Sequence, residues 1–200
     1  MIEDILDLTT EIINQVQNEY TRPQAFVLHT VIENETPYVQ IEALNRNHTV
    51  LFKIRAKQSD VGLIFKYPCI YEYDDALLRK WKLKRMNIEN LPDKTYWDLL
   101  KFGDVFNLEY DSFDYQDLKR LVLNHDTTEI GIINNNYTGV YDTTLLRTVM
   151  FDNCEDISLK ILFNDAPLRL KFKLGFFDVY CLIAPRIYEE IRGDIGYLKV

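Results

Sequence analysis

A strict alternation of apolar and basic residues marks one stretch near the end of the chain. Over residues 168–174 the sequence reads LRLKFKL, with leucine or phenylalanine at every even number. A period of two predicts a β-strand with one apolar and one basic face, because successive side chains of a strand point to opposite sides. Gly175 predicts a turn, and residues 177–183 predict a second strand that stops before Pro185. The stretch therefore predicts a β-hairpin, in the simplest interpretation at the edge of an antiparallel sheet.

The composition predicts a folded chain with an acidic surface. The 200 residues are 47% hydrophobic and carry a net charge of −8. This length suits one large domain or two small ones. The negative charge argues against non-specific nucleic-acid binding over the whole surface, although a basic patch within an acidic body stays compatible with it.

The cysteines predict reduced, mostly buried thiols in an intracellular protein. Cys69, Cys154 and Cys181 are odd in number and far apart, and none has a second cysteine or a histidine at zinc-ligand spacing. The N-terminal residues contain neither a basic segment nor a long apolar run. From this we expect no signal peptide and no membrane span.

The first half of the chain predicts a helix, several strands and a second helix. Residues 2–20 have an apolar stripe at helical spacing, opposite a face that carries Asp4, Asp7 and Glu11. Strands are predicted over residues 25–33, from 38 onward, 50–56 and 61–67. Asp74 predicts the N-cap of a helix whose cations are crowded together. A solvated face is the ordinary interpretation of such a cluster, and a phosphate-facing helix is the alternative. The cations are Arg79, Lys80, Lys82, Lys84 and Arg85.

The second half repeats a similar order of elements. Residues 87–104 are irregular and predict a connector. A strand over 105–110 precedes a helix over 113–124 that is capped by Asp111 and Ser112. Further predicted elements are strands over 129–133 and 137–141, a short helix over 143–151, and closing strands from Asp156. Together the two halves predict the α+β fold class.

No catalytic motif is present. The sequence lacks the glycine-rich phosphate-binding motifs, the HExxH zinc motif and the GxSxG nucleophile motif. His29, His48 and His125 have no partners at ligand spacing. We therefore expect no metal and no cofactor, and an enzyme is the least favoured class.

Two segments resemble the DNA sliding clamps, the proliferating cell nuclear antigen family of eukaryotes and archaea. One is the hairpin, with DAPLRL at 165–170 and LIAPRI at 182–187. The other is YVQIEALNRNHTVL at 38–51. The resemblance implies two similar clamp-like domains, 1–86 and 105–200, joined by the connector 87–104. It also implies that sheets lie outside, that helices lie inside, and that subunits close edge to edge into a ring around duplex DNA, with a homotrimer expected.

The resemblance further implies two binding surfaces. The two segments would be neighbours in space and would form a pocket for a short apolar-aromatic motif of DNA polymerases and other replication proteins. The implied pocket residues are Leu44, His48, Thr49, Leu51, Leu182, Ala184, Pro185 and Arg186. Cations on the inner helices would attract phosphates without reading sequence. The implied set is Arg79, Lys80, Lys82, Lys84, Arg85, Lys119, Arg120 and Arg147. Such a protein acts with DNA, in the cytoplasm of a prokaryotic host or in a nucleus.

Other hypotheses remain open beside this one. The chain is shorter than the subunits of that family, and the polar face of its predicted first helix is acidic. A clamp-like adaptor or decoy that binds replication proteins without forming a ring on DNA is therefore the second hypothesis. An unrelated α+β interaction protein, dimerised on the hairpin edge, is the third.

Overall fold

The computed structural model describes seven segments of the chain. They are residues 23–45, 49–62, 69–74, 80–85, 105–124, 127–186 and 195–200, with only the backbone given for 23–27, 43–45, 69–74, 80–85 and 148. The predicted helix over 2–20 and the predicted connector over 87–104 lie outside these residues.

The first half of the described chain is built mostly of strands. Three long strands follow one another, and a single helical turn then ends at Gly62, whose φ of 67° is left-handed. The elements are β1 Pro23–Glu33, β2 Thr36–Asn45, β3 Val50–Lys57, α2 Gln58–Val61, β4 Cys69–Asp74 and β5 Lys80–Arg85.

The second half mixes strands with short helices. The helices follow aspartate N-caps, Asp114 before α4 and Asp142 before α5. The elements are β6 Asp111–Ser112, α4 Tyr115–Leu123, β7 Glu129–Asn134, β8 Tyr137–Asp142, α5 Thr143–Leu146, the 3-10 turn η3 Arg147–Val149, β9 Glu155–Lys160, β10 Leu168–Leu174, β11 Phe177–Ile183 and β12 Ile195–Lys199.

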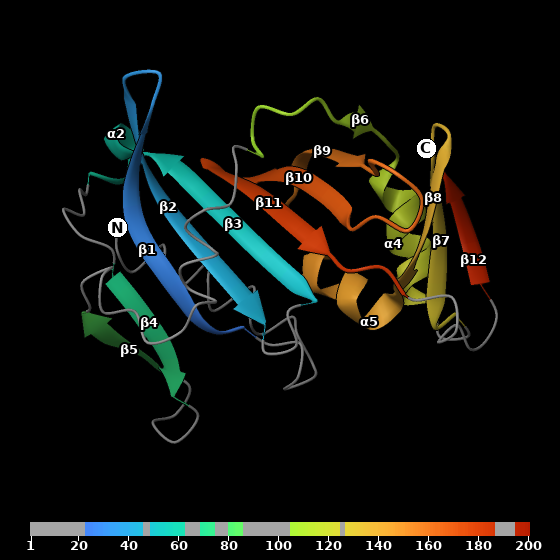
Figure 1. Ribbon diagram of the computed structural model, residues 1–200, viewed down its shortest axis with the longest axis horizontal. Helices are drawn as coiled ribbons and strands as arrows, with labels where there is room; N and C mark the ends of the chain where they lie inside the picture. The colour runs from blue at the N-terminus through green and yellow to red at the C-terminus, as the bar shows by residue number, and fades with distance from the viewer. Residues whose placement is uncertain are drawn as a thin grey trace.

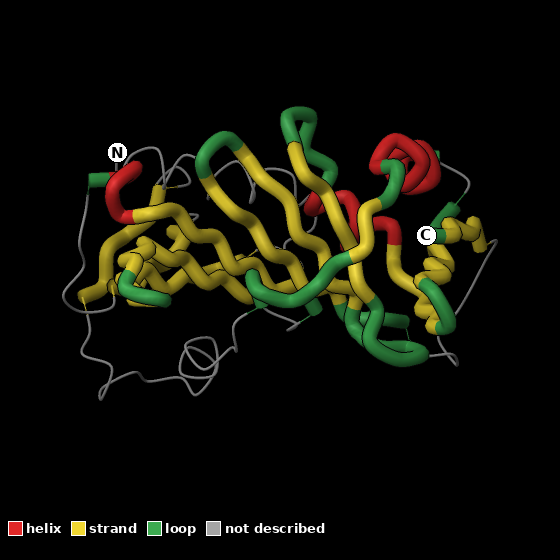
Figure 2. The backbone as a smooth tube through the Cα atoms, turned by 90° about the horizontal axis from the view of Figure 1, so that it is seen from above, coloured by secondary structure: helices red, strands yellow, loops and turns green. Residues whose placement is uncertain are grey.

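The strands that the structure describes form two sheets. Among these strands, the larger sheet has nine in the order β5-β4-β1-β2-β3-β11-β10-β9-β6, and the smaller sheet has the order β12-β7-β8. In Figure 1 the large sheet runs through the molecule, and the small sheet stands at one end beside α4 and α5. The strands of the large sheet run side by side in Figure 2. The predicted α+β class is confirmed.

The predicted hairpin is confirmed, but its place at a sheet edge is wrong. Leu168–Leu174 pairs antiparallel with Phe177–Ile183, and Gly175 in the turn has a φ of 58°. On its outer sides β11 pairs with β3, and β10 pairs with β9. The hairpin is central because both of its outer sides are paired, and its second face is partly covered as well, since Tyr180, which points away from the alternating apolar row, is fully buried. A dimer through a hairpin edge is thereby excluded.

The predicted basic helix is wrong where the structure describes it. Residues 80–85 form strand β5, which pairs with β4 from Lys80 opposite Asp74 to Arg85 opposite Cys69. The sequence KWKLKR alternates charged and apolar residues up to Lys84, and this period of two outweighs the N-cap signal at Asp74. Arg79 lies outside the described residues.

Three smaller predictions are also wrong. Residues 105–110 form an irregular segment rather than a strand, since Val105 and Phe106 are both buried and the next residues are exposed without alternation. Asp111 and Ser112 pair with β9 instead of capping a helix. Val61 ends the helical turn α2 instead of starting a strand.

One face of the large sheet forms the core. Leu118 and Val122 of α4 are fully buried and belong to the same apolar cluster as Leu170 of β10 and Phe52 of β3. By strand alternation, the residues between these core positions lie on the opposite face. This opposite face, which carries Leu51, is called the outer face below.

Candidate functional site

Strands β3 and β11 bring the two resemblance segments together. Leu51 lies opposite Leu182 in the antiparallel register, and Val50 lies opposite Ile183. Beyond the last paired residues, the backbone N–H of Ala184 donates to the carbonyl of Thr49 over 2.8 Å. Residues far apart in the chain therefore form one continuous ladder, which we call the β3–β11 junction.

The junction presents an apolar row on the outer face. Directly opposed residues of antiparallel strands share a face. Leu44 of β2 is opposite Leu51, which is opposite Leu182. Leu51 is 4% exposed, whereas Leu182, Ala184 and Pro185 are partly exposed. The structure thus places most of the implied pocket residues side by side, and His48 lies outside the described residues.

Arg186 differs from the other implied pocket residues. Its guanidinium contacts the carboxylate of Asp142 at 2.7 Å and that of Glu129 at 3.6 Å, and Glu129 is 2% exposed. Its backbone N–H donates to the carbonyl of Val140 over 2.7 Å. Arg186 therefore fastens the end of β11 to β7 and β8, in addition to lying at the junction.

Among the described residues, the implied DNA-binding cations lie on two separate parts of the fold. The register connects Lys82 through Glu72 and Ala25 to Leu44, which places Lys82 on the outer face. Lys80 and Lys84 share that face by alternation. The helices α4 and α5 pack on the other face.

The cations of the helical region have carboxylate or carbonyl partners. Lys119 Nζ lies 2.6 Å from Asp152, and Arg120 lies 2.6 Å from Asp117. Arg147 donates from Nε to the carbonyl of Val122 over 3.4 Å. The described structure therefore separates the β5 cations from those of α4 and η3.

A buried polar cluster on the outer face was missed from the sequence. Glu42, 1% exposed, contacts Lys53 Nζ at 3.2 Å and accepts a hydrogen bond from Gln40 Nε2 over 2.6 Å. His29 Nε2 lies 3.6 Å from the same carboxylate. The sequence contains a signal for this cluster, because Glu42 and Lys53 each alternate with apolar residues on two strands that a turn connects. The cluster is charge-balanced by the pair itself, as buried ions generally require.

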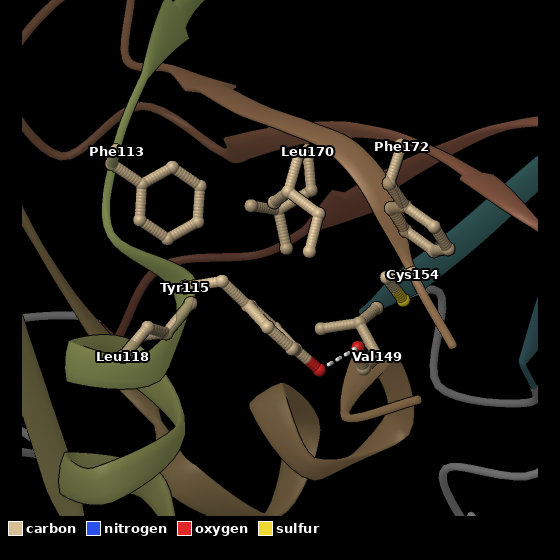
Figure 3. Close-up of a pocket in the computed structure, with 8 residues that line it drawn as sticks. Phe113, Tyr115, Leu118, Val149, Cys154, Leu170 and Phe172 are labelled. Carbon is tan, nitrogen blue, oxygen red and sulfur yellow. Dashed lines mark hydrogen bonds between the residues drawn. The ribbon is translucent and has the colours of Figure 1, made fainter. Parts of the chain in front are cut away.

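A small pocket lies between α4, η3 and β10 (Figure 3). It is lined by Phe113, Tyr115, Leu170, Phe172 and other apolar side chains, and its free volume of about 10 Å³ is close to that of one water molecule. The hydroxyl of Tyr115 donates to the carbonyl of Val149 over 3.2 Å. Burial raises the pKa of the Cys154 thiol to about 11, so this thiol is a poor nucleophile near neutral pH. The pocket is too small for a substrate.

Metal-ligating residues do not cluster in the described segments. Within them, no group of three or more His, Cys, Asp or Glu side chains could hold a metal ion. Among the helices that the structure describes, none is long and apolar enough to cross a membrane.

Comparison with known proteins finds similarity in structure but no match in sequence. No protein-family model matches the sequence, and no curated protein matches it. The chain is similar to a solved chain from the complex described as the C-terminal region of FEN-1 bound to A. fulgidus PCNA, with a TM-score of 0.48 and 11% identity over 94% of this chain and 97% of that chain.

Proposed function

We propose that the chain is a non-catalytic, clamp-like protein of DNA replication that docks partner proteins at the β3–β11 junction. In its full form this is a processivity factor, a homo-oligomeric ring around duplex DNA, with clamp-like domains over 1–86 and 105–200. One observation carries the proposal: Leu51 lies opposite Leu182, and Thr49 accepts the hydrogen bond of Ala184. This is the adjacency that the sequence resemblance requires of a partner pocket.

The chemistry of the junction suits a short apolar segment of a partner. Leu182, Ala184 and Pro185 are partly exposed beside the buried Leu51. Aromatic side chains gain most from such a surface, because a phenylalanine or tyrosine buries a large apolar area with few rotatable bonds. A partner segment therefore needs apolar and aromatic residues, with polar residues toward solvent.

Docking is tested by fluorescence anisotropy. The probe is a fluorescein-labelled peptide with one leucine and two phenylalanines between polar residues, and a scrambled peptide serves for comparison. We expect Leu182→Ala to weaken binding about tenfold, the effect of roughly 1.4 kcal/mol of lost apolar contact. Leu162→Ala, at an exposed position in the loop between β9 and β10 that does not belong to the implied pocket, is the matched control. Equal weakening by both variants, or no binding by the unmodified protein, contradicts the proposal.

The ends of the large sheet support head-to-tail association. Among the strands that the structure describes, the outermost are β5 and β6. β5 consists largely of lysine and arginine, whereas the other end carries Asp111 on β6 and Glu155 on the adjacent strand β9. Opposite charges at opposite edges favour pairing of different edges, which generates rings when the rotation closes.

The adaptor without a ring is the second candidate, and the cation placement favours it. Lys82 lies on the outer face, while Lys119 and Arg120 near the helical face contact aspartates at 2.6 Å. Light scattering coupled to gel filtration, at two salt concentrations and with added duplex DNA, separates the candidates. A stable trimer supports the ring. A monomer that still binds the peptide supports the adaptor.

A further inference from the structure

Residues 105–110, which we call the strap, cross the outer face of the large sheet. Val105 and Phe106 are each 4% exposed, so the strap is anchored through its first residues. The Phe106 ring meets Tyr180 of β11 edge-on, with 6.4 Å between ring centroids. The Phe106 carbonyl accepts a hydrogen bond from Lys171 Nζ of β10 over 2.6 Å.

Arg55 of β3 connects the strap to three strands. Its guanidinium lies 3.9 Å from the centroid of the Phe106 ring and 4.5 Å from that of Tyr38 on β2. It also pairs with the carboxylate of Glu33 at the end of β1, and the other oxygen of Glu33 accepts a hydrogen bond from Asn107 of the strap. Arg55 is 8% exposed. The planar cation is thus held between two aromatic rings and one carboxylate.

The strap lies beside the apolar row of the junction. Leu51 and Arg55 share the outer face of β3, and Leu182 and Tyr180 share that of β11. Two residues along a strand span about 7 Å. Phe106, which touches Tyr180 and Arg55, therefore lies within reach of a partner side chain placed over Leu51 and Leu182.

We propose that Arg55 is a positioning residue for partner docking: it fixes the strap as one wall of the junction site. The inference rests on the proposed docking function and adds to it a residue that touches no partner itself. An arginine is required because only a planar guanidinium stacks between two rings while it binds a carboxylate. A lysine keeps the charge toward Glu33 but loses the stack.

The experiment combines two measurements on the full chain. Amide hydrogen exchange of residues 105–110 reports the attachment of the strap, and peptide anisotropy reports docking. Arg55→Lys is expected to speed exchange in the strap and to weaken peptide binding about tenfold, or roughly 1.4 kcal/mol. Glu33→Gln, which breaks the ion pair without changing shape, is expected to act in the same direction. Lys57→Ala, an exposed position on the same face of β3, is the matched control and should change neither.

A coupling test guards against a merely destabilised fold. Phe106→Leu keeps apolar burial and removes the ring, so Arg55→Lys combined with Phe106→Leu should weaken binding no more than the stronger single variant. Faster strap exchange with unchanged affinity, or unchanged exchange and affinity in Arg55→Lys, overturns the positioning role and leaves docking intact. Absence of peptide binding by the unmodified protein overturns docking and the positioning role together.

Discussion

Gly139 and Gly131 lie on neighbouring strands of the small sheet, yet a side chain at the two positions meets different surroundings. A Cβ at Gly139 would collide with the hydroxyl of Tyr141 and lie 2.7 Å from its Cζ, and Tyr141 is fully buried. Burial raises the pKa of that phenol, so its hydroxyl stays protonated and donates to the carbonyl of Ala166 over 2.7 Å. A Cβ at Gly131 would lie 2.5 Å from Cε1 of Tyr197, whose side chain is 60% exposed.

We therefore expect the same substitution to have different costs at the two glycines. Gly139→Ala should lower the free energy of unfolding by about 1–3 kcal/mol, because a fully packed ring cannot yield. Gly131→Ala should cost less than about 1 kcal/mol, because the exposed Tyr197 ring can rotate away. Urea unfolding of both variants measures the difference, and equal costs contradict this account of the packing.

The described thiols should be unreactive in the folded protein near neutral pH. Burial raises the pKa of Cys154 to about 11 and that of the fully buried Cys181 well above its usual value. Because the thiolate is the reactive form, alkylation of a Cys69→Ser variant by iodoacetamide should be slow near neutral pH and rise as pH approaches about 11. Fast alkylation of the folded Cys69→Ser variant near neutral pH would show that these thiols are not buried.

At the scale of elements, the cap of α4 gives a direct test. The carboxylate of Asp114 accepts a hydrogen bond from the backbone N–H of Gln116 over 2.8 Å. Asp114→Ala should lower the free energy of unfolding by about 1 kcal/mol. Ser112→Ala is the matched control, since Ser112 lies on β6 and caps nothing. A larger loss from Ser112→Ala than from Asp114→Ala would restore the cap predicted from sequence.

Local periodicity predicted the elements whose two faces differ. The β10–β11 hairpin alternates so regularly that its strands and turn followed from the residues alone, as did β7 and β8 around Asn135. The helix predicted over residues 80–85 was wrong because the dense charge and the possible cap at Asp74 indicated a helix, whereas the alternation that indicates a strand covers only a few residues. The strand predicted over residues 105–110 was wrong because the burial of the strap depends on Arg55, Lys171 and Tyr180, which are distant in the chain.

For the candidate site, too, the sequence predicted only some of the features that the structure shows. No local pattern pairs β3 with β11, because register between distant strands is set by packing across the whole sheet. The sequence resemblance supplied the adjacency of Leu51 and Leu182. Arg55 stayed unnoticed because an arginine on a predicted strand has no local sign that aromatic rings will enclose it. The position of Lys82 on the outer face follows only from registers across several strands.

At the scale of the whole molecule, the cations of α4 and those of β5 are expected to contribute differently to DNA binding. In a ring with helices inside, Lys119 and Arg120 face the DNA and the β5 lysines do not. We expect Lys119→Gln with Arg120→Gln to reduce the slope of log affinity against log salt concentration by about 0.9 for each cation removed. The triple variant Lys80→Gln, Lys82→Gln, Lys84→Gln should leave that slope unchanged.

The reverse order in this comparison would mean that DNA meets the outer face, which contradicts a ring with helices inside. If neither variant changes the slope, these cations do not bind DNA, and the adaptor is the candidate that stays. In both candidates the β3–β11 junction stays the place where partner proteins dock, and this is the central claim.

Photo-crosslinking tests that claim most directly. A leucine- and phenylalanine-containing peptide with a benzophenone in place of one aromatic ring is irradiated with the full chain, and the modified residues are mapped by mass spectrometry. The account predicts crosslinks in the segments that contain Thr49 and Leu51, or Leu182 and Ala184, and their loss when unlabelled peptide competes. Competed crosslinks concentrated elsewhere, for example at the exposed Tyr137 and Phe163, would contradict it.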